Sequence, residues 1–359
     1  MTRQLLIGTY TEILPHVSGR ARGILQAEFD GTTVRDARVV AEVANPSWVA
    51  ATADGSRVYA VSETEPDGAI VAFARAGGDG AGGDGAAGDG ALVELSSESS
   101  GGAAPAHLAL HPSERFLATG TYGGGSISVF ALAEDGSLAA RTAFVQHEGS
   151  GPDADRQEGP HVHQLSFDPT TGDLVVVDLG LGDVRWYAFG DDGSLTPRPE
   201  ATIVLGAAGP RHIVFAPDAR HAFVANELDS TIDVLRRDGG RFVVASSTST
   251  RPEGASGVNS PAAVRVTDDG RTVFVTNRGD DTVAVFAFDG PSASLTLVDA
   301  VPTQGRTPRD LVVAPGGSRV LTANQDSGDV TVFAFDQQSR ALTFLSTAPV
   351  PTPVSLHFV

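Results

Sequence analysis

The sequence of 359 residues predicts an all-β fold, a seven-bladed β-propeller with four antiparallel strands in each blade. The first observation is a block that recurs about every 50 residues: a proline-containing turn, an apolar run, a second turn, another apolar run and a polar pair. The second is that the runs are short, rich in β-branched and aromatic residues and bounded by Gly, Asp and Pro, with no helical period. The third is that seven units of about 50 residues account for the whole length.

Six copies of the block are complete. They begin at Pro46, Pro105, Pro160, Pro210, Pro261 and Pro308. Each copy supplies the first two strands of a blade, for example PRHIVFAPDARHAFVANE from Pro210. A third short run such as SISVFAL or TVAVFAF follows each copy, and a fourth run closes several of the units. Six blades are therefore predicted to be continuous in sequence.

The two ends of the chain supply the seventh blade. The C-terminal PVSLHFV begins like a first strand after Pro353, and the N-terminal LLIGTYTE matches a second strand. The segment RGILQAEF then matches a third strand, and the run around Val39 a fourth. One C-terminal strand joining three N-terminal strands would close the ring and leave no open sheet edge. The chain is therefore expected to form a single propeller domain over residues 1–359.

One segment interrupts the pattern. Residues 77–91, GGDGAGGDGAAGDGA, lie between the third and fourth strands of one blade. The tract faintly resembles calcium-binding glycine–aspartate repeats, but it lacks the apolar residue that those repeats bury at fixed spacing. A flexible loop insertion is therefore expected there.

Composition excludes several classes of function. The chain has no cysteine and no lysine, which excludes disulfides, thiol nucleophiles, Schiff-base chemistry and a Walker-type phosphate loop. A net charge of −19 disfavours nucleic acid and anionic membranes as partners. The N-terminus resembles neither a signal peptide nor an anchor, and no apolar run is long enough to span a membrane, so a cytoplasmic location is expected.

Polar residues are predicted to gather at one mouth of the central channel. The start of the first strand and the end of the antiparallel second strand of each blade must share one face of the ring. The first-strand openings bring His107, His161, His163, Arg211, His212 and Arg309 to this face. The second-strand ends bring Glu63, Tyr122, Asp178, Asn226, Glu227, Asn277, Arg278, Asn324 and Gln325, and a preceding loop offers Arg156, Gln157 and Glu158. Arginine and histidine in a concave mouth favour an anionic small molecule.

Other interpretations exist for single members of this set. Asparagine at a strand end is often a turn former. The His161-Val162-His163 segment would place two imidazoles on one side of a strand, and with Asp178 and Glu227 nearby they could begin a metal site. Three arginines in the same mouth would repel a cation, so neither a metal nor a cofactor is expected. No Gly-x-Ser-x-Gly segment supports a serine hydrolase.

An ordered series of motifs carries a resemblance. GTYTE, RQEGPHVH, VVDLGLGDV, GPRH, NEL, NRGDDT, TPRD and ANQDSGDV follow one another along the chain. The series resembles the seven-bladed propeller lactonase family, typified by bacterial 6-phosphogluconolactonase and fungal carboxy-muconate cyclase, from Leu5 to Val359. The resemblance implies a monomeric or weakly dimeric, metal-independent enzyme that opens or forms a lactone bearing anionic groups. By motif, its catalytic group carries over to His163, Arg211 and Glu227, with Arg278 or Arg309 as a further arginine.

Two segments depart from the family pattern. Gly120-Thr121-Tyr122-Gly123 stands where Ala-Asn-Tyr-Gly is usual, and Val61-Ser62-Glu63 stands where Asn-Glu is more typical. Both changes make the mouth slightly less polar, so they bear on the identity of the substrate.

The leading hypothesis is hydrolysis of 6-phosphoglucono-1,5-lactone to 6-phosphogluconate, a step of the pentose phosphate pathway. His163 or Glu227 would take a proton from water, and Arg211 would stabilise the oxyanion. The substrate-binding residues are expected to be His161, His212, Arg278, Arg309, Arg156, Asp178, Asn226, Asn277 and Asn324. Two alternatives remain: a muconate cycloisomerase that forms a lactone on the same scaffold, and a non-catalytic propeller that serves as an interaction platform.

Overall fold

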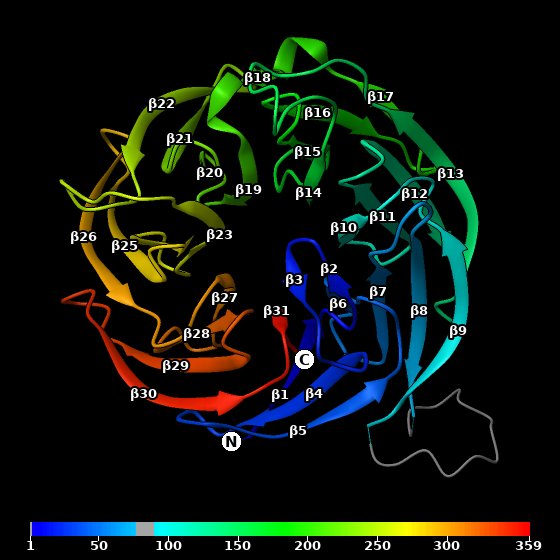
Figure 1. Ribbon diagram of the computed structural model, residues 1–359. Coiled ribbons are helices and arrows are strands. Elements are labelled where there is room, and N and C mark those ends of the chain that lie inside the picture. The colour runs from blue at the N-terminus through cyan, green and yellow to red at the C-terminus, as the bar shows by residue number, and fades with distance from the viewer. Residues whose placement is uncertain (1, 77–89) are drawn as a thin grey trace.

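Seven antiparallel sheets, six of four strands and one with a short fifth strand, stand around a central channel in a computed structural model that describes residues 2–76 and 90–359 (Figure 1). Six of the sheets consist of consecutive strands, and the seventh has the order β31-β1-β4-β5. The predicted propeller, its four strands per blade and its closure by one C-terminal and three N-terminal strands are therefore confirmed.

The strands follow the predicted units closely. The first three complete blades are β6 (Val49–Ala51), β7 (Arg57–Ser62), β8 (Ala69–Arg75) and β9 (Leu92–Ser99); β10 (Pro105–Leu110), β11 (Phe116–Thr121), β12 (Ser126–Leu132) and β13 (Leu138–Gln146); and β14 (Val162–Phe167), β15 (Leu174–Asp178), β16 (Asp183–Phe189) and β17 (Leu195–Pro197), with β18 (Ile203–Val204) also on β16. The next three are β19 (Pro210–Phe215), β20 (His221–Asn226), β21 (Thr231–Asp238) and β22 (Arg241–Ser249); β23 (Ser260–Val266), β24 (Thr272–Arg278), β25 (Thr282–Asp289) and β26 (Ser294–Pro302); and β27 (Pro308–Val313), β28 (Arg319–Asn324), β29 (Asp329–Phe335) and β30 (Leu342–Pro349). The closing blade is β31 (Pro353–Phe358), β1 (Arg3–Thr9), β4 (Ile24–Phe29) and β5 (Val34–Ala41).

The closing blade joins the two ends of the chain by strand pairing. Ile7 on β1 lies opposite Leu356 on β31 and opposite Leu25 on β4. Gly8 follows at a close approach, because a Cβ there would lie only 2.7 Å from the carbonyl oxygen of Pro46 in the next blade. A larger residue at this position would push the closing blade away from its neighbour.

The core consists of apolar layers between neighbouring blades. In one such layer Phe223 of β20 packs with Val264 and Val275 of the following blade, and all three are fully buried. The fourth strands form the outer rim, and they alternate or are largely exposed, as in β13. Burial is highest in the middle of a blade, as in β11, and lowest in the outermost strand, so the first strand of each blade rests on a closely packed core where it borders the channel.

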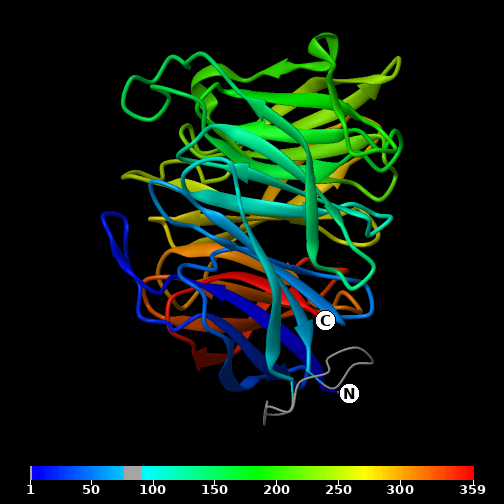
Figure 2. The ribbon, with the colours of Figure 1, turned by 90° about the vertical axis from the view of Figure 1, so that its right-hand side faces the viewer.

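Three features differ from the predicted pattern. A hairpin of β2 (Ile13–Leu14) and β3 (Val17–Ser18) follows β1 and lies over the centre of the ring in Figure 1; Figure 2 shows it projecting from one face. The outer strand of the β14–β16 blade is divided into β17 and β18 by the 3₁₀ turn η1 (Pro199–Ala201), because prolines cannot donate to the sheet ladder. A second such turn, η2 (Gly206–Ala208), precedes β19.

The glycine- and aspartate-rich loop predicted at 77–91 falls almost entirely outside the described residues. The flanking strands β8 and β9 are the third and fourth of their blade, as expected. Within the described part of the chain, no helix has the length and apolar character needed to cross a membrane.

Candidate active site

A cavity of about 390 Å³ opens at the channel mouth where the first strands begin. It is lined by His16, Glu63, Ala106, Tyr122, Arg156, His163, Glu227, Ser260, Arg278 and Arg309. A smaller cavity of about 20 Å³ shares four of these residues and adds others, Arg211 and His212 among them. The predicted rim residues therefore do converge, and the volume suits a small metabolite.

A β-bulge at the start of the first strand aims the key side chains into these cavities. Val162 pairs with Asp178 and Gln164 with Val177, so His163 is an extra residue without a partner across the ladder. The same shift leaves Arg211 and Arg309 unpaired in their blades. A bulge interrupts the in–out alternation of a strand and redirects the extra side chain. Ala106 and Val354, the extra residues of two further blades, also line the cavities.

Glu227 is the centre of an arginine cluster. Its carboxylate lies 2.6 Å from Arg156 Nη2, 2.6 Å from Arg278 Nη2 and 3.2 Å from Arg211 Nε. Burial alone would raise the pKa of Glu227, but Arg278, Arg211 and Arg156 together hold that pKa far below its usual range. Glu227 is therefore a firmly ionised group and a weak base, whose main effect is to hold three guanidinium groups in place.

His163 presents a neutral imidazole to the cavity. Its side chain is only 6% exposed, and burial, reinforced by Arg211, lowers its pKa well below the usual value. Among the described residues, no group hydrogen-bonds its Nδ1. The ring is held edge-on between Tyr122 and His212, with centroid separations of 5.7 and 5.2 Å. A fixed imidazole with an unpaired nitrogen has the properties required of a general base.

Arg211 lies at the floor of the site. It is 2% exposed, and its Nη1 donates to the carbonyl oxygen of Ala262 at 2.7 Å. The Nε–H has no hydrogen-bond acceptor within the described residues, although Glu227 lies close by. Burial, together with Arg278 and Arg309, lowers the pKa of Arg211. A buried guanidinium that lines a cavity, as Arg211 lines the smaller one, can stabilise a developing oxyanion.

Arg309 lines both cavities. Its Nη2 donates to the hydroxyl of Tyr10 at 3.1 Å, and its Nη1 donates to the side-chain oxygen of Gln325 at 3.2 Å. Both partners are uncharged, whereas Arg278 donates directly to the carboxylate of Glu227. Arg309 is therefore the cavity arginine best placed to bind an anionic group of a ligand.

Four arginines and two glutamates surround the two cavities, so the site carries an excess of positive charge. Arg278 is buried, and burial lowers its pKa, with Arg309 and Arg156 acting in the same direction. The electrostatic repulsion between like charges in a buried site decreases when an anion binds there. The described residues contain no group of three His, Asp or Glu side chains placed to hold a metal ion.

Sequence reasoning left several cavity residues out of the predicted site. Glu63 and Tyr122 were placed on the rim without a role, and the structure brings both into the wall. Tyr10 directly follows β1, the second strand of its blade, so the strand-end rule applied to the other blades also identifies it. His16 comes from the β2–β3 hairpin, where its ring meets Tyr10 edge-on at 5.5 Å. No sequence pattern indicated that the hairpin reaches the mouth.

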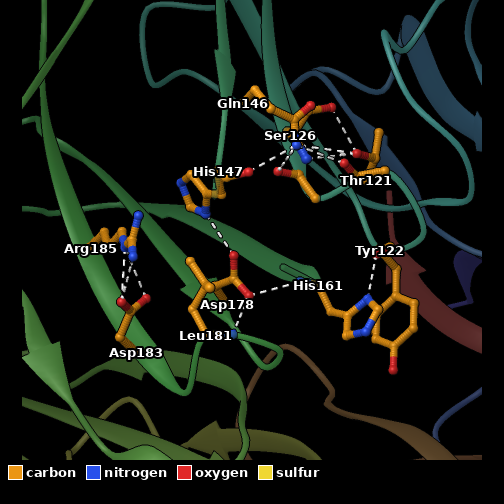
Figure 3. Close-up of polar contacts among 12 residues, drawn as sticks. Thr121, Tyr122, Ser126, Gln146, His147, His161, Asp178, Leu181, Asp183 and Arg185 are labelled. Carbon is orange, nitrogen blue, oxygen red and sulfur yellow. Dashed lines mark hydrogen bonds and ion pairs between the residues drawn. The ribbon is translucent and has the colours of Figure 1, made fainter. Parts of the chain in front are cut away.

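Asp178, predicted to bind substrate, lines neither cavity, and Figure 3 shows its contacts. It is fully buried: its Oδ2 lies 2.6 Å from His147 Nδ1, and its Oδ1 accepts from the backbone N–H groups of His161 and Leu181. His147 in turn contacts the hydroxyl of Tyr187 at 2.8 Å. The expectation is corrected, because a carboxylate whose oxygens are used in this way holds the strand opening and has no access to a ligand.

Three asparagines also require correction, because all are fully buried and none lines the cavities. Asn226 donates to Asp233 of its own blade, and Asn324 donates to Asp329. Asn277 donates to the carbonyl oxygen of Thr250. Two of the amides thus bind carboxylates and one binds a backbone carbonyl, so all three hold the ends of strands and are not available to a ligand.

The two remaining predicted contacts are only partly brought to the site. His161 precedes β14, stacks on Tyr122 at a centroid separation of 4.4 Å and contacts the carbonyl oxygen of Tyr122 through Nδ1 (Figure 3). It does not line either cavity, so the predicted pair of imidazoles on one strand face is not formed. His212 lines the smaller cavity, where burial lowers its pKa well below the usual value.

The loop that carries Arg156 reaches the mouth through a close backbone contact. A Cβ at Gly180 would lie 1.9 Å from the carbonyl oxygen of Gly159 and 2.7 Å from the backbone nitrogen of His161. Only glycine allows the loop to lie this close to the end of β15. Arg156 is thereby brought to Glu227, 71 residues further along the chain.

Comparison with known proteins gives a consistent result. A family model described as the seven-bladed β-propeller lactonase matches residues 4–358. A 6-phosphogluconolactonase of Bacillus subtilis (strain 168) is 32% identical over 313 residues, which cover 86% of this chain and 84% of that protein. A periplasmic gluconolactonase of Pseudomonas aeruginosa superposes with a TM-score of 0.89 at 29% identity, over 100% of this chain and 99% of that one. A protein of Lactobacillus plantarum has a TM-score of 0.89 at 31% identity, over 100% of both chains.

Proposed function

The chain belongs to the seven-bladed β-propeller lactonase family, and from that premise we propose that it hydrolyses 6-phosphoglucono-1,5-lactone to 6-phosphogluconate. It is an enzyme of the lactonase type, which replaces the alternative of a non-catalytic platform. The observation that carries the choice of substrate is the excess of guanidinium groups around a cavity of about 390 Å³. Such a site favours a small lactone with a phosphate or carboxylate.

The proposed mechanism begins with a water molecule held between His163 and the lactone carbonyl carbon. His163, whose imidazole lines both cavities, takes a proton from the water. The negative charge of the bound substrate would raise the pKa of His163 toward the working range, since an anion favours the imidazolium. Glu227 stabilises that imidazolium and keeps Arg211 and Arg278 in position.

Arg211 is assigned to the oxyanion of the tetrahedral intermediate. Its guanidinium lines the smaller cavity, and one well-placed donor to the oxyanion is worth about 3 kcal/mol in the transition state. Arg309, with Arg278 and Arg156, would bind the phosphate. The cytoplasmic location and the monomeric or weakly dimeric state expected from the sequence remain predictions, and one relative with the same fold is periplasmic.

The experiment that tests the reaction measures three substrates with the same enzyme preparation. We expect rapid opening of 6-phosphoglucono-1,5-lactone, slower opening of unphosphorylated glucono-1,5-lactone, and no lactone formation from a carboxy-muconate. Formation of a muconolactone, without hydrolysis of the sugar lactones, would instead identify a cycloisomerase.

Replacing Arg309 by glutamine should raise KM for the phosphorylated lactone by about 10- to 100-fold, because a hydrogen bond to a charged group contributes about 1.5–3 kcal/mol. KM for glucono-1,5-lactone, which has no phosphate, should change much less. Steady-state kinetics on both substrates provide the measurement. Arg22→Gln, which removes an exposed arginine paired with Glu42, is the matched control and should change neither value. An equal rise for both lactones would show that Arg309 does not bind the phosphate.

The decrease of kcat/KM on the acid side of the pH profile should occur at an unusually low pH. Because burial lowers the pKa of His163 well below 6.5, the imidazole of the free enzyme stays neutral as the pH falls through that value. Protonation of His163 should therefore not lower the rate as the pH falls through 6.5, and the acid limb should lie well below that value. A loss of activity centred above pH 6.5 in the His163-containing enzyme would contradict the assignment of this residue as the base.

A further inference from the structure

We propose that Glu63 is the general acid of the reaction and donates a proton to the ring oxygen of the lactone as the carbon–oxygen bond breaks. The inference rests on the proposed hydrolysis. It assigns a function to a second carboxyl group that the sequence placed on the rim without a role.

The position of Glu63 meets the geometric requirement for an acid. It directly follows β7, is 9% exposed, and lines both cavities together with His163. His163 belongs to β14, two blades further along the chain. A substrate in the larger cavity can therefore contact an imidazole from one blade and a carboxyl group from another.

Within residues 2–76 and 90–359, hydroxyl groups and no guanidinium contact the carboxyl group of Glu63. The hydroxyl of Tyr10 lies 2.9 Å from both oxygens, and the hydroxyl of Ser47 contacts Oε2. Among the described residues Oε1 contacts Tyr10 alone, so Oε1 is the oxygen that can carry an exchangeable proton. Glu227, in contrast, is paired with three arginines.

These surroundings shift the pKa values of Glu63 and Glu227 in opposite directions. Burial raises the pKa of Glu63, and this effect exceeds the opposing influences of Arg309, Ser47, Tyr10 and Arg211. The pKa of Glu227 is instead held far below its usual range. Two carboxyl groups in one cavity with opposite shifts can divide into a protonated and an ionised member, as acid–base sites require. Across the cavity Glu63 also faces His16, His163, Glu227, Arg156 and Arg278.

The proton balance of the reaction is complete with these two groups. His163 accepts one proton from water while the water oxygen bonds to the carbonyl carbon. The tetrahedral intermediate collapses, the bond from that carbon to the ring oxygen breaks, and the ring oxygen takes the proton of Glu63. The product is an open hydroxy acid, and proton exchange through solvent from the His163 imidazolium to the Glu63 carboxylate restores the enzyme.

Glu63→Gln tests the acid through the leaving group. An alkoxide is a poor leaving group and needs a proton, whereas a phenolate does not. We therefore expect kcat for 6-phosphoglucono-1,5-lactone to fall about 10²- to 10⁴-fold with little change in KM. For dihydrocoumarin, a lactone whose leaving group is a phenol, the fall should be only a few-fold. Glu42→Gln is the matched control. Glu42 is an exposed carboxylate paired with Arg22, so its replacement should change neither rate.

The pH profile supplies a second readout. The wild-type enzyme should lose kcat/KM on the alkaline side of its pH optimum, as the pH rises through the raised pKa of Glu63, and the Glu63→Gln variant should lack this limb. Tyr10→Phe removes a hydroxyl that stabilises the ionised carboxylate, so it should raise the pKa of Glu63 and move the limb to higher pH. This variant keeps the carboxyl group, so it remains informative if Glu63→Gln does not fold.

The outcomes separate this inference from the proposed function. Equal losses on the two lactones, or an alkaline limb that persists in Glu63→Gln, would overturn the acid role while leaving hydrolysis established. If wild-type enzyme opens neither lactone, the proposed function itself fails. If the wild-type enzyme opens only the sugar lactone, the comparison of leaving groups is not possible. The presence or absence of the alkaline limb in Glu63→Gln then decides whether Glu63 is the acid.

Discussion

Replacing His163 by glutamine is expected to lower kcat for lactone hydrolysis by about 10²- to 10⁴-fold, the usual contribution of a positioned general base. KM should change little, because arginines bind the anionic group and His163 acts only on the attacking water. Glutamine can occupy a similar volume and hydrogen-bond to water, but it cannot accept a proton at neutral pH. Stopped-flow or coupled assays on freshly prepared lactone provide the measurement, since such lactones also open without an enzyme.

His111→Gln is the matched control for this variant. His111 lies just after β10, where it contacts Ser113 and stacks on Phe189 at 4.9 Å, and it does not line the candidate site. Its rate should equal that of the wild type. The competing assignment makes a different prediction: if Glu227 is the base, Glu227→Gln should lose the rate and His163→Gln should retain it. The three arginines around Glu227 argue against that outcome, because they hold it ionised and weakly basic.

Replacing Asp178 by alanine is expected to destabilise the fold by at least about 3 kcal/mol. The change leaves three buried partners without an acceptor: the N–H groups of His161 and Leu181, and the Nδ1 of His147. Each orphaned buried group costs about 1–3 kcal/mol. The midpoint of denaturant unfolding should shift accordingly, and the melting temperature should fall on the order of 5 °C.

Two further variants make the stability test specific. Asp178→Asn keeps an oxygen for the two backbone donors, so it should be less destabilising than Asp178→Ala. Glu42→Gln breaks an ion pair whose side chains are 76% and 66% exposed, and it should cost less than about 1 kcal/mol. If Asp178→Ala unfolds at the same denaturant concentration as Glu42→Gln, the buried contacts in Figure 3 do not hold the strand opening.

The effects of Asp178 and His163 are linked through a single strand. Asp178 fixes the backbone of His161, and His163 follows two residues later at the bulge. A loss of the Asp178 contacts should therefore also lower activity, by moving His163 and not by removing a group that touches substrate. This is the physical difference between the two residues, which the sequence placed together in one site.

The arrangement of strands was almost fully predictable from the sequence. The recurring block gave the number of blades, and the match of PVSLHFV to a first strand gave the closure. The β2–β3 hairpin was missed because two-residue strands are too short to show a period. The division between β17 and β18 was also missed, although Pro197 and Pro199 indicate an interruption of the ladder.

The candidate site was predictable as a region, but its membership was not. The rule that joins first-strand openings to second-strand ends correctly gathered His163, Arg211, Glu227, Arg278 and Arg309. The same rule also gathered Asp178 and the three asparagines, which the structure buries behind the mouth. A position at a strand end specifies which face of the ring a residue occupies, but not whether its side chain points into the channel or into its own blade.

By itself, the sequence determined the closed ring, because a period of about 50 residues with four apolar runs can bury its surfaces only in repeated sheets. It also determined that histidine, glutamate and arginine must supply the chemistry of a chain without cysteine or lysine. The tertiary structure alone decided which of them meet. The bulges turn His163, Arg211 and Arg309 into the channel, and the surroundings of Glu63 and Glu227 give identical side chains opposite protonation preferences. The bulges depend on pairing with the second strand of the same blade, and the protonation preferences depend on neighbours from other blades. A strand's own sequence contains neither effect.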